Sequence, residues 1–226
     1  PGGTYSRSQW EWGQSSYSTK EYGFEEPIDL TQATINATWV DEEEVAAQLA
    51  VEGLLLGREA RVANAVFNAT TFTGAANFLD ITYQWDSPTN ATPWADIEFA
   101  WQKCRSKCGL SKKQFSLIIT EDNVNYALKT AEIANSMLYT EAVASMSAQR
   151  KLQFLTDYFG IKNIILVNTL FESTKDGNAS PAIGNLWSNE YAMLAVICPS
   201  SNSWKVRGLG RQPAYVKIAK DFVIDE

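Results

Sequence analysis

The sequence contains no histidine, and this absence removes the side chain that most often serves as a general base. Without histidine there can be no Ser-His-Asp triad and no H-E-x-x-H zinc site. The phosphate loop G-x-x-x-x-G-K-[ST], the dinucleotide fingerprint G-x-G-x-x-G, the nucleophile elbow G-x-S-x-G and the S-x-x-K motif are also absent. We therefore expect that the protein is not an enzyme and that it carries no cofactor.

Cysteine is scarce and odd in number, with Cys104, Cys108 and Cys198 alone. Such a set fits a reducing compartment better than a disulfide framework. Cys104 and Cys108 are one helical turn apart, but two thiols without histidine make a poor zinc set, so no metal is predicted. No run of 18 apolar residues occurs, and no membrane span is expected. Because the chain begins at Pro1 without methionine, we expect a processed or partial polypeptide.

Positive charge is rare in the first part of the chain. Residues 1–100 hold 4 Lys/Arg and 15 Asp/Glu, whereas residues 101–226 hold 15 and 11, and the formal net charge is -7. This is not the strongly basic footprint of a protein that reads nucleic-acid sequence. An acidic half and a mildly basic half suit head-to-tail contacts between copies, although a solvated surface explains the charges equally well.

A long amphipathic pattern is present over residues 41–70. Asp41 can cap the first free amides, and Glu44 can complete a capping box. Gly53 and Gly57 each weaken a helix by roughly 1 kcal/mol relative to Ala, so we expect close packing there. The pattern predicts either the core helix of an α/β domain or a scaffold for a larger assembly. The spacing by threes and fours predicts one buried stripe, formed by Val45, Leu49, Gly53, Leu56, Ala60, Ala63 and Phe67.

Residues 1–40 form an arm rich in aromatic residues, Gly and Ser. Aromatic and polar residues alternate around Trp10 and Trp12 and again around Tyr22 and Phe24, which predicts two strands. A two-stranded arm is marginally stable alone, so it should lie on another surface, of the same chain or of a neighbour. The candidate inter-subunit contacts are Trp10, Trp12, Tyr17, Lys20, Tyr22, Phe24, Gly53 and Gly57.

Helix and strand patterns alternate beyond residue 70, which predicts a mixed α/β (α+β) fold without internal repeats. Helices are expected at 93–108, 121–138 and 147–159, and Gly109 and Gly160 should end the first and the last. The segments 163–171 and 191–198 are expected to be the central strands of a sheet. In all, strands are expected within 72–85, 115–120, 163–171, 191–198 and 214–224.

Four stretches, taken in order, resemble the major capsid proteins of tailed bacteriophages, which have the Hong Kong 97-type fold. The resemblance covers nearly the whole chain and lies in the order of loose patterns. The stretches are YSTKEYGFEEPIDL before a helix ending GREARVANAVFN; ITYQWDSPTNATPWADIEFA; FSLIITEDNVNYAL; and LTDYFGIKNIILVNTLF with GNLWSNEYAMLAVIC downstream.

The resemblance implies a particular domain plan. Residues 1–40 would be an N-terminal connector and E-loop hairpin, and residues 41–112 a peripheral domain whose spine helix spans 41–70. Residues 113–210 would be the axial domain, and residues 211–226 a return strand to the peripheral domain. In the namesake phage an E-loop lysine cross-links to a neighbour's asparagine. Lys20 lies in the arm, but no acceptor asparagine can be matched, so no cross-link is predicted.

The resemblance also implies a function and partners. It implies a virion shell protein that assembles in the host bacterial cytoplasm from pentamers and hexamers of itself. Scaffold, portal and cement proteins would be further partners, and packaged double-stranded DNA would be held non-specifically.

Two other hypotheses stay open. An encapsulin-like bacterial nanocompartment shares the fold but encloses a protein cargo, and the arm before the long helix favours the phage interpretation over it. A histidine-free enzyme could use Asp80, Asp86 and Asp96 around a metal, although these residues equally fit loop and helix-cap positions.

Overall fold

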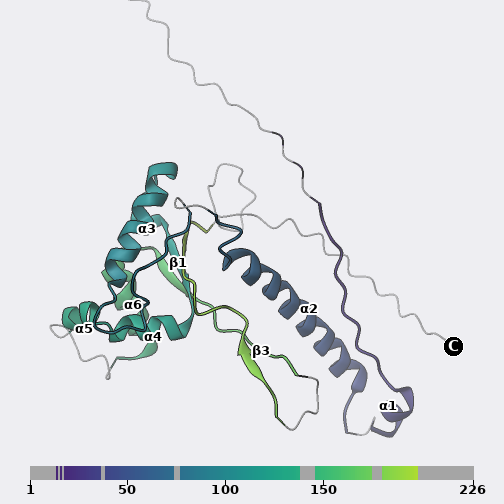
Figure 1. The fold of residues 1–226 in the computed structure, drawn as a ribbon. Helices are drawn as coiled ribbons and strands as arrows, with labels where there is room; N and C mark the ends of the chain where they lie inside the picture. The colour runs from purple at the N-terminus through teal and green to yellow at the C-terminus, as the bar shows by residue number, and fades with distance from the viewer. Residues whose placement is uncertain are drawn as a thin grey trace, which may run out of the picture. The chain divides into compact units, whose positions relative to one another are not determined.

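A computed structural model describes residues 14, 16, 18–36, 39–73, 77–137, 146–174 and 180–197. The chain divides into two compact units, residues 1–59 and residues 60–226. This division falls within the predicted spine helix, and the predicted boundaries at residues 40, 112 and 210 stay predictions. Figure 1 shows the helices and strands.

The first unit contains α1 (Leu30–Asn36) and most of α2 (Glu42–Val66). Asp29 begins α1, because its Oδ1 accepts a hydrogen bond from the Thr31 amide at 2.9 Å. The Asn36 side chain then donates to Glu42 Oε1 at 2.6 Å and links the end of α1 to the start of α2.

The start of α2 follows the predicted cap. Asp41 Oδ1 accepts hydrogen bonds from the amides of Glu43 and Glu44, at 3.2 and 3.3 Å. The predicted capping box also required the Glu44 carboxylate to accept a hydrogen bond from the Asp41 amide. Instead, the Glu44 carboxylate accepts one from Gln48 Nε2 at 3.4 Å. The helix spans 25 residues, so it is about 37 Å long. It ends before the predicted residue 70, where the Asn68 side chain stabilises a turn.

Residues 18–29 form neither helix nor strand, so the predicted strand around Tyr22 and Phe24 is wrong for this chain. Extended backbone needs a partner for its N–H and C=O groups, and the described part of the first unit contains no strand to supply one. The predicted strand around Trp10 and Trp12 lies outside the described residues.

A three-stranded sheet organises the second unit, in the order β2 (Asn163–Leu166), β1 (Ser116–Ile119) and β5 (Met193–Ala195). β1 runs parallel to β2 and antiparallel to β5. The central strand is therefore β1. The segments 163–171 and 191–198, which were expected to be central, supply the two edge strands of this sheet, β2 and β5. All four residues of β1 are buried, as a strand covered on both faces requires.

Among the described residues that follow α2, the sheet is accompanied by the helices α3 (Pro93–Cys108), α4 (Glu121–Lys129), α5 (Ala131–Met137) and α6 (Ala148–Phe159) (Figure 1). Leu117 and Ile119 of β1 contribute to the core cluster that these helices complete. That cluster consists of Ile97, Leu117, Ile119, Val124, Ala127, Leu128, Ile133, Met137, Met146, Leu155, Phe159 and Ile161.

Ile118 belongs to a second cluster, because successive side chains of a strand point to opposite faces. Ala63 and Phe67, at the end of α2, join it there together with Trp187. The Phe67 and Trp187 rings meet edge to face, with centroids 5.0 Å apart and planes at 81°. The last two positions of the predicted α2 stripe are thus buried as predicted.

The predicted helix over 121–138 is interrupted at Thr130. This residue is buried and extended, with φ -65° and ψ 143°, and the Ala131 amide donates to the Pro88 carbonyl at 2.7 Å. In a continuous helix the Ala131 amide would donate to a carbonyl of the preceding turn, whereas here it donates to a carbonyl of a loop. Gly109 and Gly160 end α3 and α6 in the left-handed conformation, as predicted, with φ of 66° and 64°.

Two strand predictions need correction. Within 72–85 the described residues form turns without a strand, and the Trp85 side chain anchors this segment by a hydrogen bond to Asp96. The segment 163–171 divides into β2 and β3 (Leu170–Glu172), and β3 pairs with β4 (Ile183–Asn185) in a separate two-stranded sheet. The predicted strand at 214–224 lies outside the described residues. The mixed α+β class is confirmed.

Candidate assembly surface

The N-terminal half of α2 carries large apolar side chains on its surface. Six of them are between 37 and 56% exposed: Val45, Leu49, Val51, Leu54, Leu55 and Leu56. At 100° per residue, Val45, Leu49 and Leu56 share one side of the helix, and the other three lie on the opposite side. Exposed apolar groups gathered at this density mark interaction surfaces more often than solvated ones. We call these six residues the α2 apolar surface.

A stripe of small residues lies between these two sides. Ala46, Ala50, Gly53 and Gly57 follow the helical spacing of four, three and four, and all four are buried or half-buried. The predicted burial of Val45, Leu49 and Leu56 is therefore wrong for this half of the helix. Large side chains keep a neighbouring segment away from the backbone, whereas a small-residue face lets it approach.

The Phe24 ring makes such an approach at Gly53. A Cβ atom placed on Gly53 would lie 3.0–3.1 Å from three atoms of this ring, closer than side chains normally pack. The predicted close packing at Gly53 is confirmed, and here the contact is made within one chain. Phe24 keeps 51% of its surface exposed, so the contact covers the backbone without burying the ring.

The other sequence candidates are distributed unevenly. Gly57 is half-buried one turn after Gly53, and Tyr22 is half-exposed. Lys20 is exposed. Trp10, Trp12 and Tyr17 lie outside the described residues.

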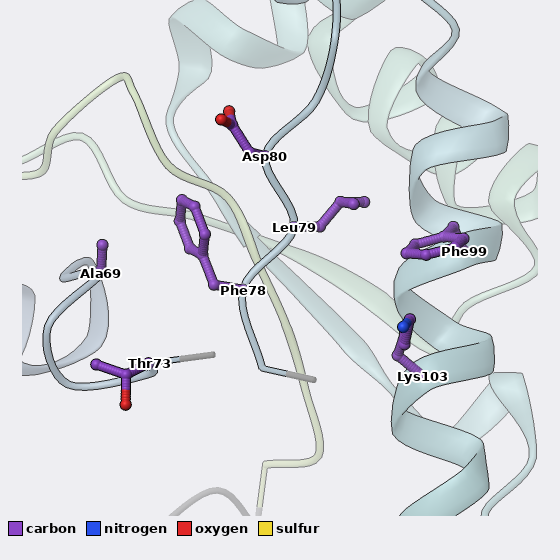
Figure 2. A pocket seen from close by; sticks show the side chains of 7 residues that line it. All are labelled: Ala69, Thr73, Phe78, Leu79, Asp80, Phe99 and Lys103. Atoms are coloured by element: carbon purple, nitrogen blue, oxygen red, sulfur yellow. The ribbon is translucent and has the colours of Figure 1, made fainter. Parts of the chain in front are cut away.

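An open hollow of about 480 Å³ lies on the second unit, between α3 and the irregular segment that follows α2. Figure 2 shows Leu79 reaching toward Phe99 of α3, with Lys103 one turn further along the helix. Lys103 Nζ is 5.0 Å from the centre of the Phe99 ring, within the range of a cation–π contact. Sequence reasoning missed this hollow, since its lining comes from separate segments: Ala69, Thr73, Phe78, Leu79, Asp80, Phe99 and Lys103.

The hollow is open to solvent, and its lining is mainly apolar with one amine and one carboxylate. Small-molecule sites are usually enclosed clefts with convergent polar groups. Its form therefore suits contact with another macromolecule better than capture of a small substrate.

The three aspartates of the enzyme hypothesis have separate roles. Asp80 lines the hollow and Asp86 is exposed in a turn. Asp96 accepts a hydrogen bond from Trp85 Nε1 at 2.9 Å; burial raises its pKa above the usual value, and that hydrogen bond opposes the shift. No group of three or more His, Cys, Asp or Glu within the described ranges could hold a metal ion. The structure thus contradicts the proposed carboxylate metal site.

Cys104 and Cys108 lie on α3 as half-buried side chains one helical turn apart. Burial raises the pKa of Cys104, the neighbouring Cys108 raises it further, and Lys107 lowers it. The reactive thiolate form of Cys104 is therefore disfavoured. None of the helices in the described ranges combines the length and apolar character that crossing a membrane requires.

No protein-family model and no curated protein matches the sequence. Among solved structures, a phage-related protein from Bordetella bronchiseptica RB50 is similar to this chain, with a TM-score of 0.56 and 13% sequence identity. The similarity covers 75% of this chain and 51% of that protein, so the chain spans about half the length of its structural relative. At this identity the comparison shows a shared fold.

Proposed function

We propose that this chain is a non-enzymatic shell subunit of a tailed-phage head, a major capsid protein of the Hong Kong 97 type. The observation that carries the proposal is the α2 apolar surface, a helix half that exposes six large apolar side chains. Because each is about half-exposed, burying the rest of it would contribute on the order of 1 kcal/mol before ordering costs. A shell repeats such a contact in every copy, so a modest contact per subunit suffices.

The phage context is supported by the similar solved structure, which is that of a phage-related protein. The mixed α+β elements fit the same context, with a long helix preceded by a segment whose described residues form no strand. In the proposed shell, the arm of one subunit lies on the helix or body of the next. Subunits close into pentamers and hexamers around double-stranded DNA and form part of the virion.

Electron microscopy of the purified full chain tests the proposal. We expect closed shells of uniform size, and particles from infected cells should show the 260/280 nm absorbance ratio of packaged DNA. Shells that enclose a stoichiometric protein cargo would favour the encapsulin alternative. A chain that stays monomeric at high concentration and turns over a substrate would contradict both shell hypotheses.

A deletion of residues 5–24 tests the role of the arm. We expect a soluble subunit that forms no closed shells, because the aromatic side chains that would bridge neighbours are gone. Lys20→Gln is the control for a single change in the same segment, and it should assemble normally. Normal shells from the deletion would remove the arm from the proposal.

A further inference from the structure

The stretch from residue 99 to residue 120 contains five cations and not one carboxylate, in a chain whose net charge is -7. Three of the cations lie on the last two turns of α3, at Lys103, Arg105 and Lys107. The other two, Lys112 and Lys113, lie on the 3-10 helix Lys112–Gln114 that follows. This is a concentrated positive region on the otherwise acidic protein.

Four of these cations have no carboxylate partner among the described residues. Lys112 is the exception, since its Nζ lies 2.5 Å from Glu98 Oε2. Lys107 donates to the neutral Asn77 side chain at 3.3 Å. Lys103, Arg105, Lys107 and Lys113 are all exposed, and we call these four residues the α3 basic end.

Aromatic rings accompany the α3 basic end. The Arg105 guanidinium lies 5.1 Å from the centre of the Trp101 ring, and Lys103 lies 5.0 Å from Phe99. Phe99 and Trp94 remain 41 and 42% exposed. Cations beside exposed rings are typical of grooves that follow a nucleic-acid backbone. On duplex DNA the cations would make the contacts, through the phosphates.

The cations also point in different directions. At 100° per residue, Lys103 and Lys107 lie on one side of α3 and Arg105 lies on the opposite side. Compensation of the helix dipole accounts for cations in the last turn, at Arg105 and Lys107, but not for Lys103 or Lys113. Charge spread around a helix end suits a ligand with many equivalent phosphates. A short acidic peptide would favour cations matched on one side.

We propose that the α3 basic end binds the phosphate backbone of nucleic acid without reading its sequence. Only one part of this inference rests on the proposed function, namely that the nucleic acid is the DNA that the shell encloses. The chemistry itself requires a polyphosphate and four exposed cations, and shell formation is not a condition for it. Neutralised phosphates release counterions, so the affinity should fall steeply with salt.

The test measures the affinity of the full chain for a fluorescent 30-base-pair duplex of arbitrary sequence by anisotropy, at several salt concentrations. The triple variant Lys103→Gln/Arg105→Gln/Lys107→Gln removes three cations from the α3 basic end. The control Lys20→Gln/Lys129→Gln/Lys151→Gln removes three cations elsewhere and has the same net charge. Circular dichroism and electron microscopy establish that both variants keep the fold and the assembly state of the parent.

We expect the Kd of the first variant to rise at least about tenfold at 50 mM salt, and the slope of log Kd against log salt to fall by up to about 2.7. The control should stay within about threefold of the parent. Equal losses in both variants, or no binding by the parent, would overturn the proposal. Equally tight binding of polyglutamate at matched charge would overturn it in favour of an acidic protein partner. A parent that binds DNA yet forms no shells would refute the proposed function and leave this inference standing.

Discussion

At the residue scale, Gly53 holds a position where two structural demands meet. As a helix residue it costs roughly 1 kcal/mol relative to Ala, but its missing side chain leaves room for the Phe24 ring. The ring is half-exposed and can therefore move aside if a methyl group is introduced. A glycine in the middle of α2 is thus explained by the segment packed on it, not by the helix itself.

We expect Gly53→Ala to keep or raise the thermal stability of α2 while it displaces the Phe24 ring. Residues 18–29 should then be cut faster by a glutamate-specific protease, which can act at Glu21, Glu25 and Glu26. Gly57→Ala gains the same helix propensity and is the matched control, with cleavage expected at the parent rate. In a Phe24→Ala background, Gly53→Ala should no longer change the cleavage rate. A persistent effect in that background would show that the ring is not the cause.

The partly buried carboxyl group of Asp96 should make the stability of the fold depend on pH. Burial raises its pKa in the folded protein above the value of about 3.9 in an unfolded chain. The folded state therefore binds more protons between these two values, and the stability that this proton contributes is lost as pH rises through the folded-state pKa. Asp96→Asn removes the titration and keeps an oxygen that can accept from Trp85.

Urea unfolding of Asp96→Asn and the parent between about pH 4 and pH 7 measures this effect. The free energy of unfolding of the variant minus that of the parent should increase with pH. Asp86→Asn, at an exposed turn position, is the control for loss of one negative charge. A difference that stays flat or decreases for Asp96→Asn would contradict the assignment.

At the scale of elements, α2 is a helix with two different halves. Its last turns contribute Ala63 and Phe67 to a core cluster with Ile118 and Trp187. Its first half presents the α2 apolar surface and a cap built by Asp41. A helix shorter than about 12–15 residues is marginal in water, so continuity with the packed half stabilises the exposed half.

The double variant Leu49→Gln/Leu55→Gln tests whether the exposed half serves assembly. Because both side chains are about half-exposed, we expect the free energy of unfolding to change by less than about 0.5 kcal/mol per residue. Shell formation, followed by light scattering and electron microscopy, should be lost. Leu155→Ala is the contrast: this buried side chain should cost about 2–5 kcal/mol. Normal assembly of the double variant would exclude the α2 apolar surface as the contact.

The elements that could be predicted from the sequence are those with strong local signals. Gly109 and Gly160 ended their helices as expected, and Asp41 capped α2. The errors occur where a distant partner decides the outcome. Thr130 breaks a helix because the Pro88 carbonyl binds the next amide, and no local pattern reports that contact. The hollow beside Leu79 was missed for the same reason, since three separate segments line it.

At the scale of the whole molecule, two forces could drive association between copies. Residues 1–59 carry 3 Lys/Arg against 11 Asp/Glu, whereas residues 60–226 carry 16 against 15. Attraction between copies through these charges would be screened by salt. The α2 apolar surface would act through apolar burial instead. An exposed ion pair contributes about 0.2–1 kcal/mol. Covering the exposed half of one large apolar side chain contributes about 1 kcal/mol, and the α2 apolar surface holds six of them, so burial should dominate.

The two forces respond in opposite ways to temperature and salt, which allows a decisive measurement. Apolar burial weakens on cooling, so the critical concentration for shell assembly should rise between 25 and 5 °C. Raising the salt from 50 to 500 mM should change that concentration much less, because only the weaker charge contacts are screened. Sedimentation, which separates assembled shells from free subunits, measures the critical concentration at each temperature and at each salt concentration. A critical concentration that follows salt strongly and temperature weakly would assign the contact to charged groups instead of to the α2 apolar surface.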